Sequence, residues 1–165
     1  MSQGKVWKYG DNVNTDVIFP GRYTYQIMTP EEMAGHALED LDPAFAANVK
    51  PGDVVVAGKN FGCGSSREQA AACLKAAGVQ AVVAKSFARI YFRNAVNLGL
   101  AVLQSDEAAD RLETGDPVDV DLARSEIRSA RGTFRFLPLP ESVLGIIAAG
   151  GLIEYTKSKL IEEQE

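Results

Sequence analysis

Short apolar runs that alternate with helix-like segments constrain the fold of this chain more than any other feature. The runs cover residues 54–57, 81–84 and 100–103, and each has the length and composition of a buried strand. The alanine-rich segment 66–77 and the segment 89–98 lie between them, and each is followed by a glycine that suits a helix C-cap. Strands and helices in this order are typical of parallel βαβ units, so we expect an α/β fold.

The segments on either side of this core have different patterns. Residues 5–9 alternate as a short strand, and Thr29, a capping residue followed by proline, predicts a helix to about residue 39. Beyond residue 105, apolar and polar residues alternate with period two, which predicts antiparallel strands with one solvated face. No shift in composition marks a domain boundary, so we expect residues 1–165 to form a single domain.

Composition and charge exclude several classes of function. The chain has 22 acidic and 17 basic residues, a net charge of -5 and no local Lys/Arg cluster, which argues against nucleic-acid binding. No apolar run reaches the roughly 18 residues of a membrane span, and the start lacks the apolar core of a secretory signal. We therefore expect a cytoplasmic protein that binds neither nucleic acid nor a membrane.

The cysteine and histidine content limits the metal chemistry of this chain. Cys63, Cys73 and the single His36 cannot complete a Cys/His zinc site without carboxylates, and two cysteines do not hold an iron–sulfur cluster in the usual way. If the protein works with such a cluster, another chain must carry it.

The densest group of reactive side chains follows the first apolar run of the core. Residues 62–67 read Gly-Cys-Gly-Ser-Ser-Arg and lead into the alanine-rich helix, whose N-terminus favours anions. One interpretation is simple capping, in which Ser65 or Ser66 caps the helix and Glu68 or Gln69 bonds back to the turn. The other is a site for a phosphate or a carboxylate. The spacing fits neither a Walker A loop nor a Rossmann fingerprint.

Further candidates lie outside this turn. Cys63 near a helix N-terminus suggests a nucleophile, for which His36 is the only imidazole base in the chain. Arg89 and Arg93 are four residues apart on one predicted helix face, where they either bind a carboxylate or simply face solvent. Arg22 lies in a loop and is a third candidate for carboxylate binding.

Three segments together resemble the swivelling domain of the aconitase superfamily. They are the block from Gly62 to Glu68, the Ser-Phe-Ala-Arg sequence at residues 86–89 and the opening segment 10–20. The opening segment is similar to the free-standing form of this domain, which is the small subunit of a hydro-lyase. The resemblance covers about residues 5–155, and it implies a swivelling β/β/α domain with a mainly parallel βαβ core and antiparallel strands in the C-terminal part.

The resemblance also implies a reaction and its machinery. The expected reaction is the isomerisation of 2- and 3-isopropylmalate by dehydration and rehydration, in leucine biosynthesis. A large subunit would carry a 4Fe-4S cluster, so we expect no cofactor or metal on this chain and activity only with that partner. The match places the base on Ser65 and a substrate-binding role on Ser66 and Arg67. A serine base needs donors for the charge on Oγ, and we expect helix N–H groups and an arginine to supply them.

Substrate choice is expected to depend on a loop that corresponds to the specificity loop of the family. Its residues Arg22, Tyr23, Thr24 and Tyr25 include no second arginine that could bind an extra carboxylate, which favours an apolar substituent such as isopropyl. The loop departs from the expected aliphatic pattern, so a methyl-substituted malate or homoaconitate is kept as an alternative substrate. A non-catalytic carboxylate-binding module is the alternative function, and self-association of the isolated chain is left open.

Overall fold

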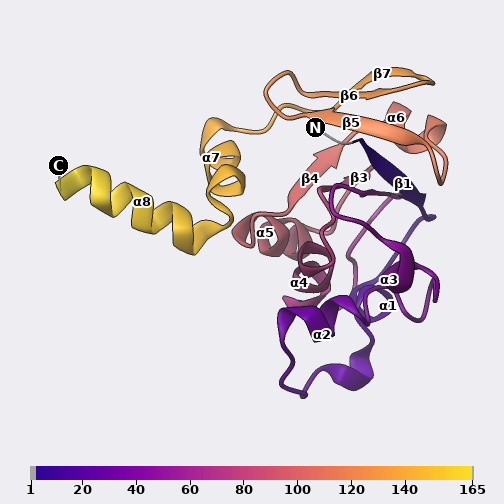
Figure 1. Cartoon of the computed structure of the whole chain (residues 1–165), viewed down its shortest axis with the longest axis horizontal. Helices are drawn as coiled ribbons and strands as arrows, with labels where there is room; N and C mark the ends of the chain where they lie inside the picture. Colours follow the sequence, from indigo (N-terminus) through magenta and orange to yellow (C-terminus); the bar gives the residue numbers. More distant parts are fainter. Residues whose placement is uncertain (1–2, 165) are drawn as a thin grey trace.

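The computed structural model describes residues 3–164, and within them the strands form one seven-stranded sheet of order β4-β3-β2-β1-β5-β6-β7 (Figure 1). The strands are β1 (Gly4–Lys8), β2 (Val54–Val56), β3 (Ala81–Ala84), β4 (Ala101–Gln104), β5 (Pro117–Asp121), β6 (Glu126–Ser129) and β7 (Gly132–Arg135).

Strand β1 joins a parallel half of the sheet to an antiparallel half. It pairs in parallel with β2, with Val6 opposite Val54, and antiparallel with β5, with Gly4 opposite Val118. Strands β2, β3 and β4 continue the parallel half, and β5, β6 and β7 form an antiparallel meander. The expected combination of a parallel βαβ core and antiparallel C-terminal strands is confirmed.

The parallel strands are buried on both faces, which explains why they are continuous apolar runs and do not alternate. Val55 belongs to a core shared with α4 (Gln69–Ala76) and α5 (Arg89–Asn97), which cover one face. Val54 and Val56 point to the other face, where they meet α6 (Asp106–Arg111) and the apolar side of the meander. The two cores hold the sheet, and therefore the loops at its edges, in a fixed position.

Short helices form a lobe beside the parallel half, at the end of the molecule away from the meander (Figure 1). They are α1 (Thr15–Ile18), the 3-10 turn η1 (Gly21–Tyr23), α2 (Pro30–Ala34) and α3 (Phe45–Asn48). The predicted start of α2 is confirmed, since Thr29 and Glu32 form a capping box. The predicted end at about residue 39 is wrong. The chain turns after Ala34, and Leu38 at φ 56° donates its N–H to the Ile18 carbonyl at 2.8 Å.

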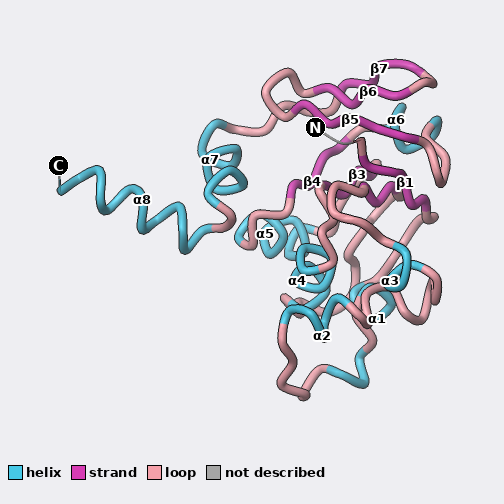
Figure 2. Tube along the Cα trace, viewed as in Figure 1, coloured by secondary structure: helices cyan, strands magenta, loops and turns pink. Residues whose placement is uncertain are grey.

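Two helices at the C-terminal end form an arm that projects from the body, as Figure 2 shows. They are α7 (Glu141–Ala149), which contacts α5, and α8 (Leu152–Gln164). Gly150 and Gly151 separate them with φ values of 89° and 136°, which L-residues with side chains rarely adopt. Within residues 3–164, no helix combines the length and the apolar character that crossing a membrane requires.

Candidate functional site

The segments that follow β1 and β2 meet at one edge of the sheet because the two strands are parallel. Gly62 donates its N–H to the Val13 carbonyl at 2.7 Å, and Thr15 donates its N–H to the Cys63 carbonyl at 2.8 Å. These bonds bring the start of α1 against the glycine-rich turn, although Thr15 precedes Ser65 by fifty residues. The site is therefore assembled by sheet pairing.

Two glycines let the turn approach its neighbours closely. Gly62 has φ 83°, and a Cβ there would lie 2.1 Å from Cγ of Tyr91. Gly64 has φ 106°, and a Cβ there would lie 3.1 Å from Oγ1 of Thr15. The backbone conformation favours glycine at both positions, and at Gly62 the space also excludes a side chain.

Ser65 follows this turn with an exposed side chain and hydrogen bonds on two sides. Its Oγ accepts a hydrogen bond from Nε of Arg67 at 3.1 Å and lies 3.1 Å from Oγ1 of Thr15. Its N–H donates to the same Thr15 Oγ1 at 3.0 Å. The hydroxyl is thus held in place by the protein while it faces solvent.

Arg67 links the turn to α1 and to the loop that follows it. Nη1 donates to Oγ1 of Thr24 at 2.8 Å, and Nη2 donates to Oδ1 of Asp16 at 2.6 Å and to the Phe19 carbonyl at 2.9 Å. The Arg67 side chain is only 13% exposed, whereas that of Asp16 is 69% exposed. Nη1 carries two N–H groups and has one acceptor within residues 3–164, so one N–H has no acceptor there.

The structure corrects the capping interpretation of this turn. Helix α4 begins at Gln69 with Glu68 as its N-cap, and no side chain bonds to that end. Ala71 and Ala72 donate their N–H groups to the Glu68 carbonyl. Within residues 3–164, no N–H of α4 donates to Ser65 Oγ, whose hydrogen-bond contacts are the side chains of Thr15 and Arg67. Of the two expected kinds of donor, the arginine is present at Ser65 Oγ.

The second serine of the turn has a different environment. Ser66 has an exposed side chain, and its carbonyl accepts a hydrogen bond from Nδ2 of Asn94 at 3.1 Å. This bond ties the turn to α5. Arg89 and Arg93 lie on the same helix and are both exposed, as expected for a solvated helix face.

The specificity-loop candidates divide into two groups. Thr24 joins the site through its bond to Arg67. Arg22 instead bonds to Glu39 at 2.7 Å and to Asp40 at 3.1 Å, and the Tyr23 hydroxyl donates to the same Glu39 carboxylate at 3.1 Å. In this form of the chain, the guanidinium of Arg22 is paired with two carboxylates outside the Ser65 group.

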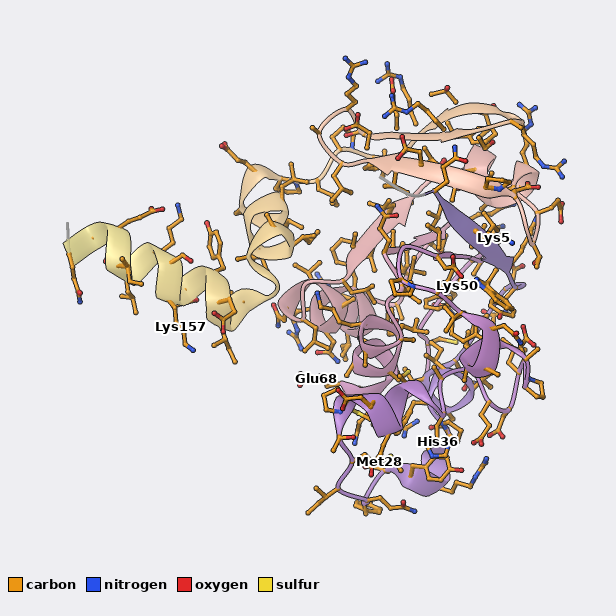
Figure 3. The ribbon with its side chains drawn as sticks, in the orientation of Figure 1. Lys5, Met28, His36, Lys50, Glu68 and Lys157 are labelled. Atoms are coloured by element: carbon orange, nitrogen blue, oxygen red, sulfur yellow. The ribbon has the colours of Figure 1, made fainter. Side chains whose placement is uncertain are left out.

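The tip of this loop exposes large apolar side chains. Tyr25 is 99% exposed and Ile27 is 102% exposed, values that a side chain reaches only when it has no packing partner. Figure 3 shows Met28 and His36 in the same lobe, at the end of the molecule away from the meander. The loop tip therefore presents apolar surface beside a polar, cationic site.

The cysteine alternative depends on Cys63 and His36, and within residues 3–164 no hydrogen bond joins these two side chains. His36 is paired with Glu39 at 3.3 Å, and its ring centroid lies 4.1 Å from that of Tyr23. Cys73 is fully buried, and burial raises the pKa of its thiol to about 12. Among residues 3–164, no group of three or more His, Cys, Asp and Glu side chains is placed to hold a metal ion.

Sequence reasoning missed two members of the site. Thr15 and Asp16 belong to the opening segment, for which the sequence predicts a family resemblance but no site residue. Nothing in their spacing points to Ser65, because the contact depends on the pairing of β1 with β2. The usable signal was the inclusion of this segment in the family resemblance.

Comparisons with known proteins agree with this architecture. The family model described as the aconitase C-terminal domain matches residues 11–108. The 3-isopropylmalate dehydratase small subunit of Caldicellulosiruptor saccharolyticus is 51% identical over 160 residues, which are 96% of this chain and 92% of that protein. The small subunit 1 of Archaeoglobus fulgidus is 50% identical over 157 residues, which are 94% and 96% of the two chains.

A solved structure extends the similarity to the whole fold. The crystal structure of 3-isopropylmalate dehydratase from Methanocaldococcus jannaschii matches with a TM-score of 0.90 and 44% identity, over 98% of this chain and 97% of that chain. The fold and the turn define this protein as a swivelling domain of the aconitase superfamily. Within that superfamily, the chain belongs to the family of 3-isopropylmalate dehydratase small subunits.

Proposed function

We propose that Ser65 is the base that this chain contributes to the isomerisation of 2- and 3-isopropylmalate. As a member of its family, the chain is the small subunit of a hydro-lyase of leucine biosynthesis and works with a large subunit. The observation that carries the proposal is the environment of Ser65 Oγ, which is exposed and accepts a hydrogen bond from a guanidinium. A cytoplasmic location and a hydroxy-dicarboxylate substrate are parts of the same proposal.

The proposed chemical step is a proton transfer to the serine oxygen. Dehydration removes a proton from the carbon next to a carboxylate and a hydroxyl group from the neighbouring carbon. The 4Fe-4S cluster of the large subunit supplies a Lewis acid for the hydroxyl. Ser65, with its own proton removed, takes the proton from carbon, and the electron pair of the C–H bond becomes part of the new double bond. Rehydration returns the proton.

Arg67 supports this step through charge. Its Nε–H at 3.1 Å from Ser65 Oγ stabilises the anionic form of the serine, and its low exposure strengthens that interaction. The free N–H of Nη1 is available to a substrate carboxylate. Asp16 competes for the same guanidinium, and its high exposure allows a substrate carboxylate to take its place without leaving a buried charge unpaired.

The loop tip supplies the proposed apolar contact. Tyr25 and Ile27 lie one and three residues beyond Thr24, which is bonded to Arg67, so the apolar tip is anchored at the site. An isopropyl group offers apolar surface for such a loop to cover, and burial of one additional CH₂ is worth about 0.8 kcal/mol. Relative turnover of isopropylmalate, methyl-substituted malate and homoaconitate by the reconstituted enzyme would decide among these substrates.

A substitution of the serine tests the proposed base. The Ser65→Ala chain, mixed anaerobically with the cluster-loaded large subunit, should lose at least about 10²-fold in kcat, because general-base catalysis contributes about 10²–10⁴-fold. Its free energy of unfolding should fall by no more than about 1–3 kcal/mol, the cost of leaving the buried Thr15 hydroxyl without its partner, so kcat is measured on the folded complex.

The matched control is Ser142→Ala, which removes an equally exposed hydroxyl at the start of α7. That variant should keep the turnover and the affinity for the large subunit of the unmodified chain. Near-normal kcat in the Ser65→Ala complex would remove Ser65 from the role of base.

A further inference from the structure

We infer that Thr15 is a positioning residue for Ser65, one that donates its hydroxyl proton to Ser65 Oγ and directs the free position of that oxygen outward. The inference rests on the proposed function of Ser65. It assigns a role to a residue of the opening segment that acts through Ser65 and does not itself take the proton from the substrate.

The hydrogen-bond partners of Thr15 Oγ1 determine which atom accepts the Thr15 hydroxyl proton. Thr15 is 1% exposed, so its proton has no access to bulk solvent. Its Oγ1 accepts the Ser65 N–H at 3.0 Å, and its other hydrogen-bond contact within residues 3–164 is Ser65 Oγ at 3.1 Å. A hydroxyl carries one proton, so the acceptor for that proton is Ser65 Oγ.

The backbone holds Thr15 in a position that does not depend on its hydroxyl. Its N–H donates to the Cys63 carbonyl at 2.8 Å, and its carbonyl accepts from Phe19 N at 3.0 Å. It is the first residue of α1, whose N-cap Asn14 accepts from the Val17 N–H. Thr15 Oγ1 lies close to Gly64, where an added Cβ would be 3.1 Å from it. The threonine therefore presents its hydroxyl to the turn from a rigid element.

The two donors define the geometry of Ser65 Oγ. Thr15 Oγ1–H and Arg67 Nε–H, both at 3.1 Å, take two of its tetrahedral positions, and Cβ takes a third. The remaining position, which holds the hydroxyl proton or the reactive lone pair, faces the exposed side of the turn. Both donors also stabilise the deprotonated oxygen, which makes the serine a stronger acid and keeps its anion aimed at a ligand.

Thr15→Val tests the hydroxyl, because valine keeps the shape and removes the donor. In the complex with the large subunit we expect kcat to fall about tenfold and the rising, acidic limb of the pH–rate profile to move up by about one pH unit. The direction follows from the loss of a donor to the anion, which raises the pKa of the serine hydroxyl. The KM should change less than about threefold. Thr15→Ser restores the donor and should restore both kcat and the profile.

Thr114→Val is the matched control, because Thr114 Oγ1 also accepts a backbone N–H, that of Lys8 at 2.9 Å, between α6 and β5. It should leave kcat and the pH–rate profile unchanged. If Thr15→Val folds poorly, Thr15→Cys supplies a weaker donor of similar size and should give a smaller shift in the same direction.

The outcomes separate this inference from the proposed function. An unshifted pH–rate profile in Thr15→Val or Thr15→Cys, together with an inactive Ser65→Ala complex, would overturn the role of Thr15 and leave Ser65 as the base. A loss of activity that is equal at every pH and is not restored by Thr15→Ser would mean a structural role only. An active Ser65→Ala complex would remove the proposed function itself.

Discussion

The Asp53 carboxylate lies just before strand β2 and the Ser65 hydroxyl lies beyond its end. The two groups differ in whether solvent or a ligand can reach the oxygen. At the start of β2, Asp53 is 5% exposed and accepts N–H groups from Lys5 at 2.9 Å, from the Trp7 indole at 2.9 Å and from Lys50 at 3.0 Å. Beyond its end, Ser65 is exposed, and its oxygen is hydrogen-bonded to Thr15 and Arg67 but keeps one free position. Both groups connect the N-terminal segment to the core.

This difference shows that the paired strands β1 and β2 hold a stabilising group at one end and the proposed catalytic group beyond the other end. The three N–H donors around Asp53 belong to residues that would be left without a partner if the carboxylate were removed. The donors around Ser65 hold an oxygen that still has a free position. Burial with complete hydrogen bonding characterises the first group, and exposure with incomplete hydrogen bonding characterises the second.

The largest effect should come from Asp53→Ala. Three N–H donors would lose their acceptor, two of them on the backbone, so the free energy of unfolding should fall by about 3 kcal/mol. Chemical denaturation of the isolated chain measures this value. The kcat of the folded fraction should be unchanged in the complex. If Asp53→Ala kept the free energy of unfolding but lost kcat, the proposal that Asp53 contributes to stability and Ser65 to catalysis would be contradicted.

A somewhat smaller effect is expected from Arg67→Lys. Lysine keeps the charge but cannot bond at once to Ser65, Thr24 and Asp16, so the serine and the loop lose their common anchor. We expect kcat/KM to fall about 10²-fold, equivalent to about 2.7 kcal/mol of transition-state stabilisation. Steady-state kinetics of the complex measures it, with Arg93→Lys on α5 as the control, since Arg93 is exposed. Equal values for the two variants would contradict the role of Arg67.

The smallest effect is expected at an ion pair of the antiparallel half. The pKa of Asp116 is lowered by its hydrogen bond from Arg131, then by the N–H of Glu113. A lowered pKa adds stability above the unfolded value of about 3.9, and this stability is lost as the pH falls through the folded value. Asp116→Asn should therefore be slightly less stable at pH 7 and match the unmodified chain at strongly acidic pH. Thermal unfolding across this range checks the sign.

Local patterns were sufficient to predict most of the fold. The valines of β2 and β3 and the glycines after α4 and α5 gave the parallel core, and the period-two pattern beyond residue 105 gave the meander. The capping box at Thr29 was also predictable, because its two side chains are only three residues apart in the sequence. The end of α2 was not, since the chain after Ala34 is held by a long-range bond from Leu38 to Ile18.

The site was predictable only in part, because several of its contacts join residues that are far apart in the sequence. The resemblance placed Ser65, Arg67 and Thr24 in one functional group, and the structure joins them through hydrogen bonds. The partners of Ser65 Oγ depend on long-range pairing, so neither the Thr15 contact nor the absence of serine capping at α4 followed from local sequence. The pairing of Arg22 with Asp40 likewise depends on how two loops pack.

The register between β1 and β2 determines the relative position of the two segments that follow these strands. Val6 opposite Val54 fixes how far each segment extends before Thr15 reaches Ser65. One residue inserted between Lys8 and Asn14 would leave the strand pairing intact and carry the threonine past its partner. The same insertion in the β6–β7 turn would leave this alignment untouched. Length variation among related chains should therefore accumulate in the antiparallel half and be excluded from these two segments.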